Sequence, residues 1–205
     1  MAPSLRRYLT TAALGLLLLF VPAALAVASL AYTGAWSFQL NCAWHDSCAG
    51  VHPDFVRLHG ENLSAFYRHQ GLLTGAWTEK EVGHLTEVRG MLDGMLVALL
   101  LMVPMLIGLW QWQRVRRAAS INLLLIAAAL LTLPFFGAFW SQVFHPLLFD
   151  NLLWKNTPMD ASWYVMPRVY FRSATAYTLL WLLLINAAAL LPSRRQKRRQ
   201  GSEEG

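Results

Sequence analysis

The chain has 205 residues, of which 56% are hydrophobic and only 14% are charged. A soluble domain carries about 25% charged residues, and a disordered chain combines low hydrophobicity with high net charge, so the composition argues against both classes. Most of the basic excess, a net charge of +6, lies in three clusters that each adjoin an apolar stretch. Such clustering indicates a membrane protein and argues against nucleic acid as a partner.

Four apolar stretches are long enough to cross a bilayer, which takes roughly 20 residues. Because backbone groups in hydrocarbon must bond within their own segment, each stretch is predicted to be a helix. The stretches cover residues 8–32, 91–112, 118–140 and 174–191. The sequence therefore predicts an all-α integral membrane protein with four transmembrane helices in a single domain, residues 1–205.

The first stretch has a second interpretation, a cleavable signal peptide. Arg6 and Arg7 precede its apolar core, and the small residues at 24–26 resemble a cleavage site. We favour an uncleaved anchor, because the apolar run continues to Tyr32 and is long enough to span the membrane.

The distribution of charge predicts the orientation of the four helices. With both termini and the basic tail 192–205 in the cytoplasm, the inner side has ten basic and two acidic residues, a net charge of +8. The outer side then has seven basic and nine acidic residues, a net charge of −2. The two outer loops, 33–90 and 141–173, are rich in aromatic residues, so we expect them to form a folded extracytoplasmic cap.

One outer segment leads directly into the second apolar stretch. Thr78 and the glutamate three residues later form a capping-box sequence, which predicts that a helix begins at Thr78. His84 and Glu87 are three residues apart and share a face of this helix, whereas Arg89 and Asp93 are four apart and could pair. His84 is expected at the depth of the lipid headgroups.

A second histidine is expected at the same depth. His145 follows the third apolar stretch within a few residues, and all six histidines of the chain lie on the outer side. A single interfacial histidine among aromatic residues is usually structural, but two from different segments indicate a shared site. The unperturbed pKa of histidine, near 6.5, suits proton transfer in both directions.

Two segments carry the signature of a known family. The first runs from Leu63 to Arg89 and includes Gly71-Leu72-Leu73-Thr74 and Glu81-Val82-Gly83-His84, and the second includes Phe144-His145, Phe149, Trp154 and Pro167. In these segments the chain resembles the bacterial lipoprotein intramolecular transacylase (Lit) family. The expected layout of four helices with an extracytoplasmic cap is also similar to that family.

The resemblance implies a reaction and a location. The substrate would be a diacylglyceryl lipoprotein with a free N-terminal cysteine amine, and the sn-2 acyl chain would move to that amine to give the lyso form. The enzyme would lie in the bacterial plasma membrane among lipids and would need no cofactor.

The resemblance also implies the roles of particular residues. His84 and His145 match the catalytic histidines of the family. We expect Glu87 to orient His84, Arg89 or Asn151 to donate a hydrogen bond to the developing oxyanion, and Asp93 to support the site. The aromatic residues expected to line the substrate pocket are Phe144, Phe149, Trp154 and Tyr170.

The two cysteines leave other functions open. Cys42 and Cys48 are expected to form a disulfide in an oxidising compartment. A membrane thiol oxidoreductase of the DsbB kind is a rival interpretation, although it needs two cysteine pairs. The spacing of Cys42, His45, Cys48 and His52 is also compatible with a metal ion, as in a metal-sensing membrane protein, although our prediction includes no metal site. A non-enzymatic membrane scaffold is the remaining alternative.

Overall fold

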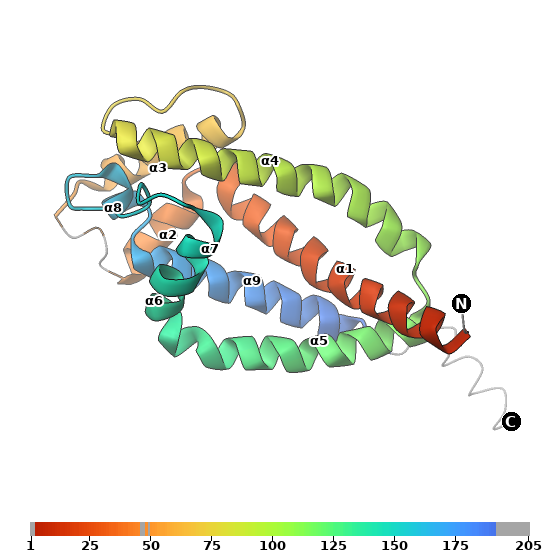
Figure 1. The fold of residues 1–205 in the computed structure, drawn as a ribbon. Coiled ribbons are helices and arrows are strands. Elements are labelled where there is room, and N and C mark those ends of the chain that lie inside the picture. Colours follow the sequence, from red (N-terminus) through yellow and green to blue (C-terminus); the bar gives the residue numbers. More distant parts are fainter. Residues whose placement is uncertain (1–2, 46–47, 49, 192–205) are drawn as a thin grey trace, which may run out of the picture.

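The computed structural model describes residues 3–45, 48 and 50–191, and the basic tail lies outside this range. All regular structure in the described residues is helical (Figure 1). The longer helices are α1 (Pro3–Tyr32), α2 (Trp36–His45), α3 (Pro53–Tyr67), α4 (Glu79–Gly108), α5 (Trp112–Thr132) and α9 (Arg168–Ala188). Three short helices complete the fold, namely α6 (Phe136–Phe139), α7 (His145–Leu148) and α8 (Ala161–Val165).

Three helical stretches are long and apolar enough to cross a membrane. They are Ser4–Tyr32, Glu79–Gly108 and Trp112–Leu148. Helix α9 is not among them, since Arg168, Arg172 and several hydroxyl side chains in its first half lower its mean hydropathy. The predicted fourth span at 174–191 therefore stays a prediction.

The helix of the third predicted span is interrupted. Helix α5 ends at Thr132, and a 3₁₀ turn over Leu133–Phe135 follows it. Pro134 explains the break, because proline lacks the backbone N–H that would continue the α-helical ladder. The chain then passes through α6 and a π-helical turn, Trp140–Phe144, into α7. Such turns are frequent at functional sites, and this one directly precedes His145.

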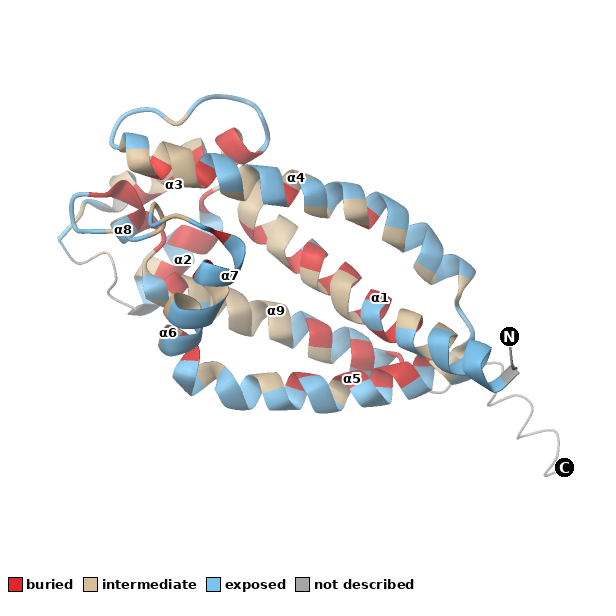
Figure 2. Cartoon of the chain, in the orientation of Figure 1, coloured by how far each residue is buried: buried red, intermediate tan, exposed pale blue. Residues whose placement is uncertain are grey.

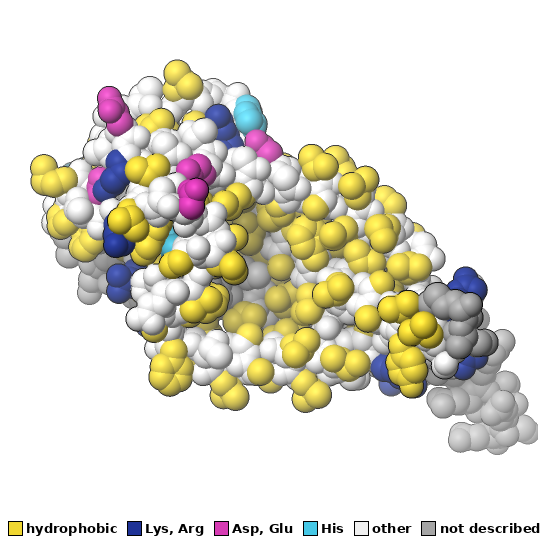
Figure 3. All heavy atoms as spheres, in the orientation of Figure 1, with side chains coloured by type: hydrophobic (Ala, Val, Ile, Leu, Met, Phe, Trp, Pro, Cys, Tyr) yellow, Lys and Arg dark blue, Asp and Glu magenta, His cyan; other side chains and the backbone are white. Residues whose placement is uncertain are grey.

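Helix α1 is the central element of the long bundle. It packs against α4, α5 and α9, and α5 also packs against α9. Figure 1 shows α4 and α5 on either side of α1, and Figure 3 shows a hollow between them that is coated with hydrophobic side chains. The bundle is thus closed along α1, α5 and α9 but hollowed beside α4.

A compact group of helices covers one end of the bundle. We call this group the head; it consists of α2, α3 and α8 with the loops that join them (Figure 1). Figure 2 shows buried residues there as well as along α1, α5 and α9. Its core joins α2, α3, α4, α8 and α9 through the buried side chains of Phe38, Leu63, Phe66, Leu85, Val165 and Tyr170.

Two buried asparagines tie three long helices together. The Asn122 amide of α5 donates to the Gly15 carbonyl of α1 and to Asn186 Oδ1 of α9, both over 3.0 Å. Asn186 Nδ2 in turn donates to the carbonyls of Leu182 and Leu18. The two side chains are 2% and 0% exposed, so these bonds satisfy amides that would otherwise be unpaired in an apolar core. Sequence analysis did not identify this pair.

Replacing Asn186 with leucine should destabilise the bundle. The substitution removes the acceptor of the Asn122 amide and the bond to the Leu18 carbonyl of α1, and hydrogen bonds between helices of membrane proteins contribute about 0.6–2 kcal/mol each. Thermal unfolding of the detergent-solubilised protein should show a lower Tm. The control is Ser120→Ala, because the Ser120 hydroxyl bonds only to the Arg116 carbonyl of its own helix. An unchanged Tm for Asn186→Leu would show that the pair contributes nothing.

Candidate active site

His84 lies on the second turn of α4, and its position follows from how that helix begins. Thr78 is the N-cap, and the predicted capping box is confirmed: Thr78 Oγ1 accepts from the Glu81 backbone N–H, and the Glu81 carboxylate accepts from the Thr78 backbone N–H. His84 is one turn beyond Glu81 on the same face. Its side chain is only 14% exposed.

His145 is the first residue of α7, directly after the π-helical turn. Its Nδ1 lies 2.9 Å from the Trp140 carbonyl oxygen. Because a carbonyl can only accept, Nδ1 carries the hydrogen and donates it, which leaves the lone pair on Nε2. The ring stacks on Trp154 with centroids 4.2 Å apart, and the residue is 4% exposed. These contacts fix both the orientation and the tautomer of the imidazole.

The fold brings the two histidines together although they are far apart in the sequence. The ring centroids of His84 and His145 are 6.2 Å apart. Phe149 touches both rings, with centroids 4.6 Å from His84 and 5.7 Å from His145. Two imidazoles at this separation can act on neighbouring atoms of one bound molecule.

A carboxylate lies beside His84. Glu87 Oε2 is 3.6 Å from His84 Nδ1, which is an ion-pair distance but longer than a hydrogen bond. The other oxygen, Glu87 Oε1, accepts from Asn151 Nδ2 over 2.8 Å. Glu87 thus connects His84 to the loop that follows His145.

Both histidines line a cavity of about 1160 Å³. At one end its wall is apolar and comes from α1, α4 and α9, including Val27, Leu30, Leu92 and Leu179. All four predicted pocket aromatics, Phe144, Phe149, Trp154 and Tyr170, line it. At the head end the lining includes polar residues, among them Glu81, Lys155, Ser162 and Arg168. The cavity therefore runs from an apolar region between the long helices, past the two histidines, to a polar region.

Comparison with known proteins identifies the family. The family model of the lipoprotein intramolecular transacylase Lit matches residues 14–171. The chain belongs to the Lit family. The name of the family indicates a transacylase, so membership does not favour the thiol oxidoreductase, metal-sensing or scaffold alternatives. No curated protein sequence matches the chain.

Solved structures of a membrane-integral Lit from Bacillus cereus share the fold. One has a TM-score of 0.81 at 16% identity, over 97% of this chain and 99% of that chain. A form with a histidine-to-arginine substitution has a TM-score of 0.76 at 16% identity, over 98% and 96% of the two chains. A histidine-to-alanine form has a TM-score of 0.73 at 16% identity, over 91% of each chain.

Neither residue predicted to donate to the oxyanion in this Lit-family chain lines the cavity. Arg89 places its guanidinium 4.1 Å from the centroid of the Phe66 ring and donates to the Phe66 carbonyl, and neither Arg89 nor Asn151 lines the cavity. Arg89 is five residues beyond His84, about 140° around the helix, so it faces another side. The Asn151 amide is engaged by Glu87. The structure therefore gives no support to either residue as the oxyanion donor.

The predicted pairing of Arg89 with Asp93 is wrong. Asp93 instead lies 3.0 Å from His69 Nε2, and it does not line the cavity. His69 has a left-handed backbone conformation, φ 58°, in the turn that follows α3, and this turn brings its ring to α4. Asp93 thus ties the head to the start of the long bundle.

The cysteines are joined to each other. A disulfide links Cys42, in α2, to Cys48. Within the described part of the chain, no group of three or more His, Cys, Asp or Glu side chains is arranged to hold a metal ion. His45 lies between the two cysteines in the sequence and His52 follows them; His52 caps α3 by accepting from the Asp54 backbone N–H.

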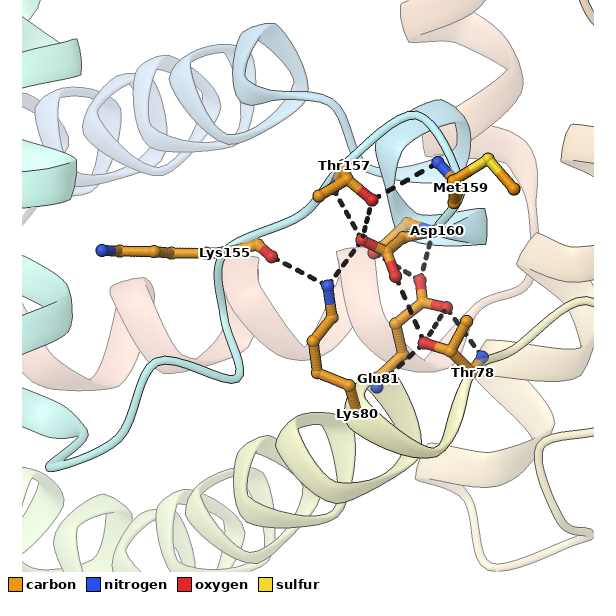
Figure 4. A network of polar contacts seen from close by, with 8 residues as sticks. Thr78, Lys80, Glu81, Lys155, Thr157, Met159 and Asp160 are labelled. Atoms are coloured by element: carbon orange, nitrogen blue, oxygen red, sulfur yellow. Dashed lines mark hydrogen bonds and ion pairs between the residues drawn. The ribbon is translucent and has the colours of Figure 1, made fainter.

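Sequence analysis missed a polar network beside the cavity. Lys80 Nζ donates to Asp160 Oδ2 over 2.6 Å and to the Lys155 carbonyl over 2.9 Å (Figure 4). Asp160 also accepts from the backbone N–H and the hydroxyl of Thr157. Lys80 and Asp160 are separated by 80 positions, so no local pattern could have shown their contact.

Tyr67 is a second residue that sequence analysis missed. It is the last residue of α3, it is 5% exposed, and it lines the cavity. Burial raises the pKa of the Tyr67 phenol above its ordinary value, and the neighbouring Tyr170 and Tyr32 raise it further. Tyr67 is therefore a neutral hydroxyl group in the cavity wall.

The Lys80–Asp160 pair should make stability depend on acid pH. Burial raises the pKa of Asp160, but the bonds from Lys80 and Thr157 outweigh it and hold this pKa below its ordinary value. A carboxyl whose pKa is lowered by folding stabilises the protein above its unfolded pKa, and this contribution is lost as the pH falls through the folded pKa. Replacing Lys80 with methionine should therefore move acid unfolding to a higher pH.

The same substitution should lower stability at neutral pH. Removing Lys80 leaves the buried Asp160 carboxylate without its cation, although Thr157 still donates to it, and such a loss costs about 1–3 kcal/mol. A circular-dichroism titration from neutral to acid pH measures both effects. Arg172→Met is the control, because Arg172 is an exposed cation of α9. Identical acid transitions in wild type and Lys80→Met would contradict this account of the pair.

Proposed function

We propose that the chain moves the sn-2 acyl chain of a diacylglyceryl lipoprotein to the amine of its N-terminal cysteine, which gives the lyso form. One observation carries this proposal. The rings of His84 and His145, with centroids 6.2 Å apart, lie in the wall of a cavity that has one apolar end. Membership of the Lit family supports the substrate class.

The polarity of the cavity supports a lipid-modified protein as substrate. The apolar wall provided by α1, α4 and α9 suits acyl chains, while the polar head end suits the peptide that follows the modified cysteine. In this orientation the glyceryl ester and the cysteine amine lie near the histidines. Holding the two reacting groups in one cavity replaces a bimolecular encounter, which is the largest source of rate in an intramolecular transfer.

The chemistry requires one proton to move and no cofactor. The amine nitrogen attacks the ester carbonyl carbon, so a C–N bond forms and the C–O bond to the glyceryl oxygen breaks. The amine loses a proton and the departing glyceryl oxygen gains one, so the overall transfer is neutral. Two imidazoles near the amine nitrogen and the glyceryl oxygen can accept that proton from the first and return it to the second.

We assign the general base to His84. The Glu87 carboxylate 3.6 Å from its Nδ1 stabilises the imidazolium that forms when His84 takes the amine proton. His145 donates Nδ1–H to a neutral carbonyl and keeps a lone pair on Nε2, so we assign it the second transfer: Nε2 takes over the proton that His84 has accepted from the amine and then delivers it to the glyceryl oxygen. Phe149 and Trp154 hold the rings in place.

We further propose that α9 is the fourth transmembrane helix and that the head is the extracytoplasmic cap. Helix α9 has 21 residues and runs beside α1 and α5, which places it inside the bundle. Lys and Arg side chains gather at the end of the bundle opposite the head (Figure 3). That end would face the cytoplasm of a bacterial plasma membrane, with both termini inside.

Substitution of either histidine should slow acyl transfer strongly. We choose His84→Gln and His145→Asn, because the asparagine amide can still donate to the Trp140 carbonyl. General acid–base catalysis contributes about 100-fold or more, so each variant should lose at least that factor in kcat. The measurement is conversion of a synthetic diacylglyceryl lipopeptide by the purified protein, followed by chromatography.

The matched control is His52→Asn, which removes an imidazole whose side chain is 78% exposed and keeps a residue suited to capping α3. It should retain wild-type activity. Size-exclusion profiles show whether each variant is folded. Wild-type turnover in folded His84→Gln and His145→Asn would rule out histidine-based catalysis.

A further inference from the structure

We propose that Lys80 and Glu81 are positioning residues, which tie the first turn of α4 to the segment that follows His145 and so set the separation of the two histidines. This inference rests on the proposed function of the histidine pair. It concerns residues that do not themselves take part in proton transfer.

The carboxylate of Glu81 caps two helices at once. Its Oε2 closes the capping box of α4 by accepting from the backbone N–H and the hydroxyl of Thr78. Its Oε1 accepts from the backbone N–H of Ser162 over 2.6 Å and from the Ser162 hydroxyl over 2.5 Å. Ser162 lies in the first turn of α8, whose own N-cap, Asp160, makes no side-chain capping bond. Glu81 is 2% exposed, so all of these bonds are shielded from water.

Lys80 makes the adjacent connection. Its ammonium group reaches two points of the segment before α8, the Lys155 carbonyl and the Asp160 carboxylate (Figure 4). The Thr78 hydroxyl lies between Glu81 Oε2 and Asp160 Oδ1, at 3.0 and 3.2 Å, and shares its one hydrogen between them. The first turn of α4 is therefore bonded to residues 155–162 through several independent contacts.

A second connection lies on the other side of His84. Glu87 accepts from Asn151, which belongs to the same segment but lies close to His145. His84 thus sits between two sets of bonds that hold α4 against residues 151–162. The extensive backbone contacts of α4 in the described structure are with α1, not with α7 or α8. Side-chain contacts therefore carry the alignment of the two histidines: these bonds act together with the packing of Leu85 in the core and of Phe149 against both rings.

Loss of this alignment should affect turnover more than substrate binding. A displacement of about 1 Å at reacting groups can reduce a rate by about 100-fold. The parts of the apolar wall that α1 and α9 contribute are not touched by these bonds, so most of the surface that suits the acyl chains stays in place. We expect Lys80→Met and Glu81→Gln to lower kcat by about 10- to 100-fold and to change KM by less than about twofold.

The experiment measures kcat and KM of the folded, monodisperse fraction with a diacylglyceryl lipopeptide. Lys80→Arg keeps a cation of similar reach and should recover kcat to within about threefold of wild type. Glu79→Gln is the matched control, since Glu79 is an exposed carboxylate in the same turn. Folded Lys80→Met and Glu81→Gln with wild-type kcat would overturn the proposal, as would a loss that appears only in KM.

A second measurement tests the alignment without any activity. In a chain carrying His84→Cys and His145→Cys, oxidation with copper phenanthroline should join the two introduced thiols. Adding Glu81→Gln should slow this cross-linking at least tenfold, whereas adding Glu79→Gln should not change it. An unchanged rate with Glu81→Gln would also overturn the proposal. A wild-type protein that leaves the lipopeptide unchanged would contradict the proposed function instead, and the cross-linking rates would still test the alignment.

Discussion

The buried carboxylate of Glu81 is the contact on which the arrangement of the site depends most. A carboxylate taken out of water is stable only if its oxygens accept enough hydrogen bonds, and here the donors come from Thr78 and from Ser162, 81 positions away. Satisfying this one group therefore requires α4 and α8 to meet. Because His84 is one turn from Glu81, and because His145 begins the segment that leads to Ser162, the same requirement brings the two imidazoles to one cavity wall.

The long bundle supplies a different constraint. Asn122 and Asn186 satisfy each other and three backbone carbonyls, which holds α5 and α9 against α1. Helix α4 has no such polar connection to α5 or α9 in the described structure, and residues of α4 and α9 line the cavity instead. The protein therefore combines a closed packing of three helices with one helix, α4, that packs mainly on α1, an arrangement that suits a substrate with long acyl chains.

The sequence predicted features that depend on local spacing. The capping box at Thr78 is one, and the shared face of His84 and Glu87 is another. The four aromatic residues expected at the pocket do line the cavity. Features that depend on distant partners were not predictable. Arg89 and Asp93 have the spacing of an ion pair, but each contacts a residue outside α4 instead. Arg89 lies over the Phe66 ring, and Asp93 pairs with His69. Ser162 and Asn186 carry no local signal, since their partners are remote in the sequence.

The most direct test of the central claim locates the acyl chain on a lipoprotein. The chain is co-expressed with a lipoprotein in a bacterium that lacks its own N-acylation, and the N-terminal lipopeptide is analysed by tandem mass spectrometry. Intramolecular transfer leaves the total mass of the lipopeptide unchanged, so the position of the acyl chain is read from the fragment ions. The account predicts an acyl group in amide linkage to the cysteine and one remaining glyceryl ester. A free amine with both glyceryl esters intact would contradict it.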